Sequence, residues 1–239
     1  MARPLRIQFE NAYYHVTCRG NARQPIFSSD TDRSAFLDLL GRSVAIYQTE
    51  ILAYVLMVNH FHLLVKTPRG NLQEFMRHFN ISYTGWYNRR HRRSGHLYQG
   101  RYHAFLIDAD NYLKEVSRYI HLNPVKVKKS RDLDAVAKKK VLSAYPWSSY
   151  PGYRSPALRR PFLQEDEILS YFGGDTVRGR RGYARYVEHG ISAALDNPLE
   201  LGRGHGIVGD AGYVDAVRGQ YLSGDADSRE IPAARSSAV

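Results

Sequence analysis

Apolar positions in the first half of the chain follow two periods, one typical of strands and one typical of helices. Residues 12–20 alternate apolar and polar side chains and contain β-branched and aromatic residues, which predicts a strand. Residues 28–48 open with Ser and Asp and then place apolar residues three and four positions apart, the pattern of a capped amphipathic helix. Two more strands are predicted over 50–58 and 60–68, with a turn between them.

The alternation of elements continues as far as residue 123. Residues 71–93 predict a helix that becomes strongly basic at its C-terminal end, 100–108 a strand, and 109–123 a second amphipathic helix. We expect Pro124 to stop that helix, because a proline disfavours helical backbone in the residue before it. The order β, α, β, β, α, β, α predicts an α+β fold, a ferredoxin-like antiparallel sheet with helices on one face.

The pattern weakens after this point, and the chain divides into four predicted parts. Residues 1–124 form the core, and 125–159 form a basic insertion followed by an aromatic connector that packs on the core. Residues 160–221 form a small helical region, with short helices separated by glycine-rich breaks. The polar tail over 222–239 is expected to be disordered, because it has too few apolar residues to bury.

Charge narrows the class of partner. The 239 residues carry a formal net charge of +11, which favours a polyanion, with nucleic acid ahead of an anionic membrane surface. No apolar run is long enough to span a bilayer, and no clean basic amphipathic helix supports membrane binding. The single cysteine, Cys18, cannot form an internal disulfide, and the first residues lack the apolar stretch of a secretion signal. Both features predict a cytoplasmic protein.

Two histidines interrupt the apolar strand YVLMVNHFHLLVKTP. On a strand, His60 and His62 project from the same face, roughly 6.5–7 Å apart, while Phe61 points the other way into a helix layer. Two imidazoles at that spacing can share a divalent cation if a third group and substrate oxygens complete its coordination. The competing interpretation is two hydrogen-bonded histidines on a solvated face. The apolar flanks favour a central strand, where polar rings need partners.

A tyrosine and an asparagine share one face of the helix predicted over 109–123. Tyr119 and Asn123 are four residues apart, so a phenol and a carboxamide lie one turn from each other. Together they can offer a nucleophile and a ligand for a metal or a phosphate. The chain has eighteen tyrosines, however, and plain packing is the competing interpretation of any one of them.

A basic segment rich in aromatic residues precedes the last predicted strand. No acidic residue occurs between Arg89 and Arg101. Arginines hold phosphates and aromatic rings stack on bases, so the segment predicts a nucleic-acid-binding edge, with a solvated helix end as the alternative. The candidate DNA-binding residues are Arg89, Arg90, Arg92, Arg93, Arg101, Trp86, Tyr98 and His96.

Four motifs, in a consistent order, resemble those of the REP-associated tyrosine transposases. These motifs are VLMVNHFHLLVKTP, YNRRHRRSGHLYQGRYHAFLID, YLKEVSRYIHLNPVK and YPWSSY. That family belongs to the single-tyrosine HUH transposases, which are related to the insertion-sequence enzymes that move single-stranded DNA. The resemblance runs from about Tyr14 to Tyr153 and is looser over 160–221.

The resemblance implies a role for each candidate residue. His60, His62 and Asn123 would bind Mg²⁺ or Mn²⁺, since the family uses Gln or Asn at the last position. Tyr119 would attack single-stranded DNA beside a palindromic hairpin and form a 5′-phosphotyrosine with a free 3′-hydroxyl. A second 3′-hydroxyl could then reverse the step without ATP. The arginine-rich segment would hold the hairpin. The resemblance also implies a bacterial protein that works as a monomer, whereas insertion-sequence relatives work as dimers.

Some features leave alternatives open. The basic insertion over 125–142 is longer than in relatives and is interpreted as a solvated insertion or an extra DNA contact. His15 and Arg19, on the first strand, could face the site near the DNA. Two other functions compete with a transposase: a non-catalytic hairpin-DNA-binding protein or repressor, and a metal-dependent hydrolase. The hydrolase would leave Tyr119 without a role.

Overall fold

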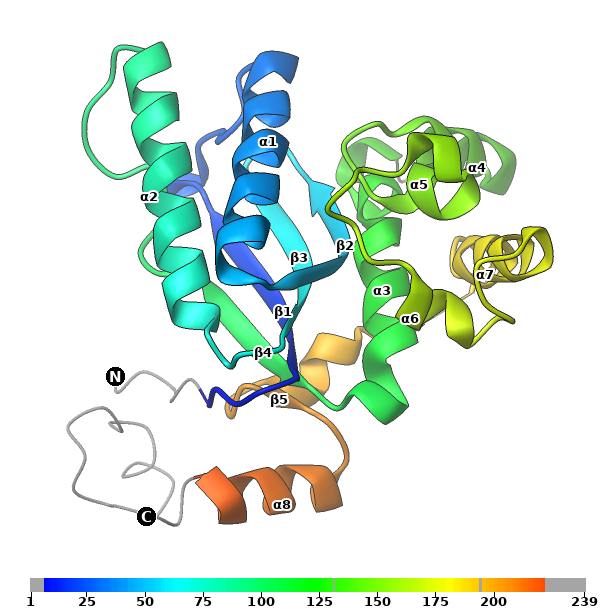
Figure 1. Cartoon of the computed structure of the whole chain (residues 1–239). Helices are drawn as coiled ribbons and strands as arrows, with labels where there is room; N and C mark the ends of the chain where they lie inside the picture. Colours follow the sequence, from blue (N-terminus) through cyan, green and yellow to red (C-terminus); the bar gives the residue numbers. More distant parts are fainter. Residues whose placement is uncertain (1–6, 131, 194, 222–239) are drawn as a thin grey trace.

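A five-stranded sheet forms the centre of the molecule, and helices lie on both of its faces (Figure 1). The computed structural model describes residues 7–130, 132–193 and 195–221, so the predicted disordered tail lies outside the described residues. The strands follow the order β2-β3-β1-β4-β5 across the sheet. They are β1 (Ala12–Arg19), β2 (Glu50–Leu56), β3 (His60–Thr67), β4 (His103–Ile107) and β5 (Ile207–Val208).

The first four strands and two helices have the predicted ferredoxin-like topology. Helix α1 (Asp30–Tyr47) joins β1 to β2, and α2 (Leu72–Arg90) joins β3 to β4. Each neighbouring pair among these four strands is antiparallel, whereas β5 is added parallel to β4. The α+β class predicted from the sequence is therefore confirmed.

The prediction that helices occupy one face holds for α1 and α2 but is wrong for α3 (Ala109–Lys126). The ring of Phe61 lies 4.9 Å from Phe36 of α1 and 6.2 Å from Phe79 of α2. The next residue, His62, points to the other face and lies 5.8 Å from Tyr119 of α3. Right-handed crossovers place α1 and α2 on the same face. Helix α3 follows the last of these strands instead, and it covers the face that they leave open.

Helix α3 also runs through Pro124 to Lys126, so the prediction that Pro124 ends it is wrong. Proline has no backbone N–H to donate to the carbonyl of Ile120. The side chain of Asn123 supplies a donor instead, because its Nδ2 lies 3.3 Å from that carbonyl and 2.9 Å from the carbonyl of Tyr119. The side chain of Asn123 thus satisfies the Ile120 carbonyl, which the proline leaves without a backbone donor, and the helix continues to Lys126.

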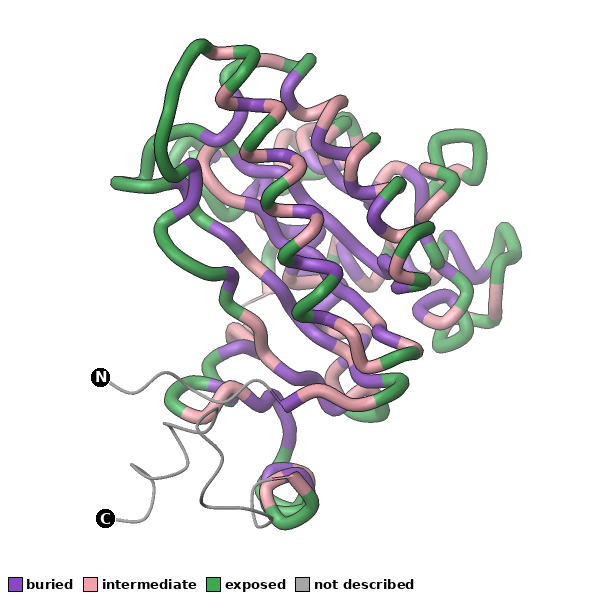
Figure 2. The backbone as a smooth tube through the Cα atoms, turned by 60° about the vertical axis from the view of Figure 1, so that its left-hand side comes forward, coloured by how far each residue is buried: buried purple, intermediate pink, exposed green. Residues whose placement is uncertain are grey.

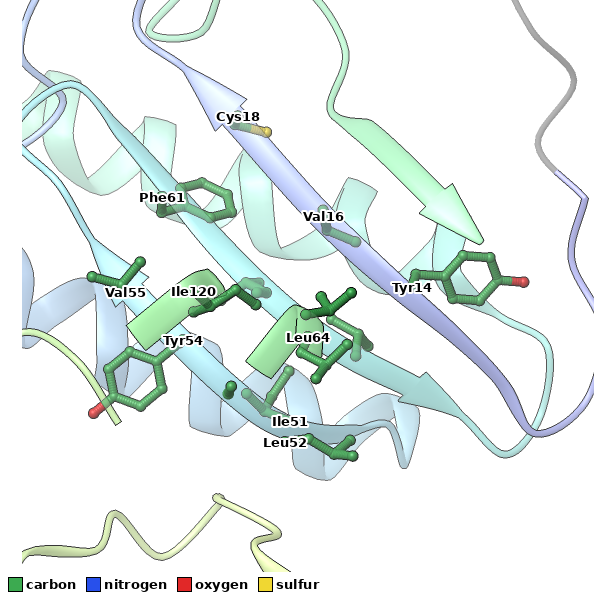
Figure 3. Close-up of a cluster of buried hydrophobic side chains, with 14 of the residues drawn as sticks. Tyr14, Val16, Cys18, Ile51, Leu52, Tyr54, Val55, Phe61, Leu64 and Ile120 are labelled. Carbon is green, nitrogen blue, oxygen red and sulfur yellow. The ribbon is translucent and has the colours of Figure 1, made fainter. Parts of the chain in front are cut away.

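Buried apolar side chains fill the space between the sheet and the layer of α1 and α2. Burial is nearly continuous along the central strands (Figure 2). Phe36 is fully buried, and its ring lies 4.7–5.2 Å from those of four other aromatic residues. Figure 3 shows part of the buried cluster, with Val16 and Cys18 on β1 beside Phe61 on β3, and Ile120 contributed by α3.

The C-terminal half of the chain closes both edges of the sheet. It contains α4 (Ala135–Ala144), α5 (Tyr150–Arg154), α6 (Asp166–Ser170), α7 (Val177–His189) and α8 (Ala211–Tyr221). At one edge, Val55 and Ile51 of β2 form bridges with Ser148 and Leu163. At the other edge, β5 pairs with β4. In the described part of the chain, no helix is long and apolar enough to cross a bilayer.

Candidate active site

The two histidines of β3 lie on the sheet face that α3 covers. In the pairing of β1 with β3, Arg19 lies opposite His60 and Thr17 lies opposite His62. Side chains directly opposite each other in such a pair project from the same face. The His60 and His62 rings lie 5.0 Å apart and nearly perpendicular to each other. The structure thus brings together the pair that the strand pattern predicted on one face.

A third histidine, His15 of β1, completes this cluster. Its Nε2 lies 2.8 Å from Nδ1 of His62, and the side chain is almost fully buried. The strand pattern predicts that His15 could face the site, but it does not predict this hydrogen bond. The available signal was the spacing of His15 from Arg19 on one strand face, but the bond exists only because β1 pairs with β3.

Burial keeps all three imidazoles neutral. It lowers the pKa of His15 to about 3 and, with the nearby charge of Arg19, that of His60 to about 4. The pKa of His62 is held well below its usual value by burial, by the two other histidines and by Arg19. At neutral pH each ring therefore keeps a lone pair on one nitrogen, which is the form that binds metals.

The tautomer of His60 follows from its neighbour. Asn59 donates from Nδ2 to the carbonyl of Arg23 at 2.9 Å, which leaves its Oδ1 facing Nδ1 of His60 at 2.8 Å. An amide oxygen only accepts hydrogen bonds, so Nδ1 of His60 carries the proton and donates it. The lone pair of neutral His60 is consequently on Nε2.

The ring of Tyr119, which lies on α3, packs against the histidines of β1 and β3. The ring centroid lies 6.0 Å from that of His15 and 5.8 Å from that of His62, edge-on in both cases. Burial and the charge of Glu200 raise the pKa of the phenol, and the charge of Arg19 opposes that shift. The phenol is thus neutral at pH 7, and chemistry that uses it as a nucleophile must remove its proton.

Asn123 lies one turn beyond Tyr119 and has a free oxygen. Its Nδ2 is engaged by the helix backbone, while its Oδ1 accepts no hydrogen bond from the described residues. Within 7–130, 132–193 and 195–221, no three His, Cys, Asp or Glu side chains are grouped to hold a metal ion. A metal on this face would therefore need ligands in addition to the ring nitrogens of the histidines.

The arginine-rich segment is divided between exposed and engaged side chains. Arg90 pairs with buried Asp32 at 3.4 Å and lies over the ring of Trp86 at 5.7 Å, so both residues support the local structure. Arg93 lies over the ring of Tyr87 at 5.7 Å. The remaining candidates of this segment are exposed and form no ion pair with the described residues: Arg89, Arg92, His96 and Arg101.

Tyr98 lies deeper than the other candidates of this segment. Its ring is largely buried and lies 6.2 Å from Phe61, yet Tyr98 also lines a surface pocket, so its contact with DNA stays a prediction. The surface beside it is a pocket of about 490 Å³ with several amide side chains. Its polar lining residues are Asn21, Asn80, Thr84, His96, Gln99 and Arg101.

Comparison with known families identifies the domain that contains these residues. Residues 8–123 match the family model described as "Transposase IS200 like", and this range includes every histidine of the cluster, Tyr119 and Asn123. Residues 8–123 are an IS200-like transposase domain. No curated protein matches the sequence.

Solved structures add a likeness in fold to this IS200-like transposase domain. A REP-associated tyrosine transposase bound to a REP hairpin is similar with a TM-score of 0.54 and 16% identity, over 74% of this chain and 98% of that chain. At that identity the likeness shows a shared fold alone. A tRNA(His) guanylyltransferase from Saccharomyces cerevisiae matches with 10% identity over 82% of this chain and 86% of that chain. Its TM-score of 0.37 is too low to indicate a common fold.

The C-terminal half adds a wall beside Tyr119 of the transposase domain. A pocket of about 490 Å³ lies between α3 and residues 195–201, and Tyr119 and Lys126 line it. The Nζ of Lys126 lies 5.9 Å from the centroid of the Tyr119 ring. Burial, with the nearby charge of Arg118, lowers the pKa of Lys126. Tyr119 thus lies beside both the histidine cluster and a second pocket, whose charged lining residues are Glu115, Arg118, Lys126, Asp196 and Glu200.

Proposed function

We propose that this transposase cleaves and rejoins single-stranded DNA beside a hairpin, with Tyr119 as the nucleophile. One observation carries the proposal: the Tyr119 ring lies within about 6 Å of two buried, neutral histidines on one face of the family domain. A tyrosine that only packed would not need imidazoles beside it. Two buried polar rings, His15 and His62, in place of apolar side chains have a cost in stability, which a function explains.

The residues present fit a divalent cation, Mg²⁺ or Mn²⁺. We infer that Nε2 of His60, Nε2 of His62 and Oδ1 of Asn123 would hold it, since each keeps a lone pair that no described residue uses. Three protein ligands leave room for water and phosphate oxygens in a six-coordinate shell. When bound, such a cation stabilises the negative charge that builds up on a phosphate under attack.

His15 acts as a positioning residue for His62. A His62 ring that offers Nε2 must carry its proton on Nδ1, and that proton is donated to Nε2 of His15 at 2.8 Å. His15 then carries its own proton on Nδ1, which is buried and has no partner among the described residues. Leaving this buried N–H unpaired lowers the stability of the fold, and the need to orient His62 as a metal ligand explains that cost.

The reaction exchanges one phosphodiester for another. Oη of Tyr119 attacks the phosphorus, the bond from phosphorus to the 3′-oxygen breaks, and a 5′-phosphotyrosine forms. The phenol proton is lost to solvent, and the leaving 3′-oxygen takes up a proton, so the products are the covalent adduct and a free 3′-hydroxyl. The reverse attack by a 3′-hydroxyl rejoins DNA without an external energy source.

The exposed arginines of 89–101 are our proposed contact for the hairpin. The similar REP-associated transposase was solved with a REP hairpin, which supports hairpin DNA as the substrate class. Arg89, Arg92 and Arg101 have no acidic partner among the described residues, so their charges are available to phosphates. One chain contributes the histidines, Tyr119 and Asn123, which supports a monomer as the working unit.

A denaturing gel with doubly labelled DNA tests the proposal. The substrate is a hairpin from the host genome with a single-stranded 5′ extension, incubated with Mn²⁺ or with EDTA. We expect Mn²⁺ to convert the 3′-labelled product into a protein-linked species, while the 5′ label appears on a shorter strand with a free 3′-hydroxyl. Tyr119→Phe should give neither product and still bind the hairpin.

Other outcomes identify the competing functions. Cleavage without a protein-linked product, retained in Tyr119→Phe, would indicate a hydrolase with water as the nucleophile. Binding without any cleavage in the wild-type protein would indicate a hairpin-binding protein. Either result contradicts the proposed role of Tyr119.

A further inference from the structure

A second basic surface lies on α7, outside the IS200-like domain. Arg178, Arg181 and Arg185 are three and four residues apart, so they share one side of this helix, and all three are exposed. Together with Arg154 of α5 and Lys139 of α4, they line a groove of about 1010 Å³. We refer to this surface as the α7 groove.

The acidic residues of the α7 groove are already neutralised. Asp175 pairs with Arg180 at 2.5 Å, and Glu188 pairs with Lys139 at 2.6 Å. In contrast, the four other arginines form no ion pair or side-chain hydrogen bond with the part of the chain that the structure describes. These residues are Arg154, Arg178, Arg181 and Arg185. The groove therefore has four cations without a counter-charge.

A buried arginine fixes the rotation of α7. The Arg180 side chain is 5% exposed, pairs with Glu165 at 2.8 Å, and donates to the carbonyls of Gly152 and Tyr153 at 2.8 and 3.0 Å. Tyr183, on the same inner side, is fully buried. Because the inner side of α7 is held by these contacts, the arginines at 178, 181 and 185 must face outward.

We propose that the α7 groove binds the sugar–phosphate backbone of duplex DNA. Arg178 and Arg185 are about 10 Å apart along the helix axis, a length over which one DNA strand presents roughly three phosphates. Among the described residues that line the groove there is no aromatic, Asn or Gln side chain, so no ring is available there to stack on an unpaired base. It matches a duplex backbone rather than single-stranded DNA. This inference rests on the proposed function in one respect, because that function makes DNA the expected polyanion.

The two basic surfaces of the protein therefore have different chemistry. The pocket near Tyr98 contains amides, which can form hydrogen bonds with bases, whereas the α7 groove offers charge and hydroxyl groups. The α7 groove would hold the base-paired part of a substrate, or its flanking duplex, whatever its sequence. An anionic membrane surface is the competing partner, and the test includes it.

Salt-dependent binding by the full-length protein tests the α7 groove. We would measure the affinity for a blunt duplex of unrelated sequence, by fluorescence anisotropy over a range of salt concentrations. The variant is the triple substitution Arg178→Ala, Arg181→Ala and Arg185→Ala, which keeps good helix formers on exposed positions. Log affinity falls as log salt rises, and each lost phosphate contact should make this negative slope shallower by about 0.9. The triple variant should therefore have a slope that is shallower by roughly 2–3.

A control with the same net charge separates the groove from charge in general. Arg42→Ala, Arg69→Ala and Arg218→Ala remove three arginines that form no ion pair with the described residues and lie outside the groove. We expect this control to keep the wild-type slope. Replacing Arg178, Arg181 and Arg185 with Lys should keep it as well, which would show that a loss in the alanine variant is not due to misfolding.

Three results would overturn the inference. The first is an equal slope for the alanine variant and the wild-type protein, and the second is an equal loss in the control. The third is a loss of binding to anionic phosphatidylserine vesicles with duplex affinity unchanged. These readouts measure binding and not cleavage. The test of the α7 groove therefore does not depend on whether Tyr119 forms an adduct, and the adduct test does not depend on the α7 groove.

Discussion

The two faces of β3 are lined by side chains of different chemistry. Phe61 points into the aromatic layer of α1 and α2, where it contacts Phe36 and Phe79. Its neighbours His60 and His62 point to the face that α3 covers, where the nearest groups are polar rings. Both faces are largely buried, yet aromatic rings dominate the first face and imidazoles gather on the second.

Burial therefore has two consequences on this one strand. On the face of Phe61, burial stabilises the fold by removing apolar surface from water. On the face of His62, burial lowers stability but keeps the imidazoles neutral and able to bind a cation. Substitutions on the first face should therefore change unfolding, and those on the second face should change metal binding and cleavage.

The largest expected effect is that of His60→Ala. Removal of a proposed ligand should reduce Mn²⁺ affinity and adduct formation by at least about 100-fold, the upper end for loss of an outer-shell partner. His60 is only partly buried, so the free energy of unfolding should change little. Electron paramagnetic resonance of bound Mn²⁺ and urea denaturation measure the two quantities. A large loss of stability with unchanged Mn²⁺ affinity would contradict the comparison.

The matched substitution one residue away is Phe61→Ala. Loss of this fully buried ring should lower the free energy of unfolding by about 3–5 kcal/mol, because a cavity opens between Phe36 and Phe79. The fraction that stays folded should bind Mn²⁺ with nearly the wild-type affinity. Urea denaturation and Mn²⁺ titration at low temperature measure both. Reduced affinity in the folded fraction would show that the two faces are coupled.

His15→Leu tests the positioning of His62. Without the bond at 2.8 Å, the His62 ring loses its orientation, and Mn²⁺ affinity should fall about 10–100-fold. Stability should hold or rise, since a buried imidazole with an unpaired Nδ1 is replaced by an apolar side chain. His15→Gln offers an amide oxygen to Nδ1 of His62 and should restore part of the affinity. Equal losses in both variants would leave His15 a packing residue.

A smaller effect is expected from acid. In the unfolded chain histidines bind protons below about pH 6.5, whereas the folded protein holds the pKa of His60 at about 4 and that of His15 at about 3. The unfolded state thus takes up more protons between these values, so stability falls as pH falls from 6.5 to 4. Each of these histidines contributes at most about 1.4 kcal/mol per pH unit to this loss, and urea denaturation in EDTA measures the slope. His15→Leu should make the dependence less steep.

Local patterns predicted much of the fold, and non-local contacts account for most of the errors. Alternation along 12–20 and 60–68 set the inner and outer residues of β1 and β3, because side-chain direction is a local property of a strand. The bond between His15 and His62 depends on which strands are neighbours, and no local pattern encodes that order. The depth of Tyr98 was not predictable for the same reason, since its bridge with Gly20 returns the chain to β1 and covers most of the ring.

Helix α3 shows a different kind of error. The rule that proline ends a helix rests on the unsatisfied carbonyl one turn earlier, and Asn123 removes that condition with its side chain. An asparagine next to a proline is usually a turn signal, so the sequence rule favoured the wrong outcome. The same residue was correctly placed one turn from Tyr119, because helical spacing is local.

The closed sheet edges have a consequence for anyone who cuts this chain. A fragment limited to residues 8–123 would lose the bridges from Ser148 and Leu163 to β2, and it would also lose β5 beside β4. Both edges would then present unpaired peptide groups, which recruit strands from other copies and lead to aggregation. The range that the family model matches is thus not expected to be a soluble fragment by itself. Its solubility depends on residues outside 8–123, which cover both edges of the sheet.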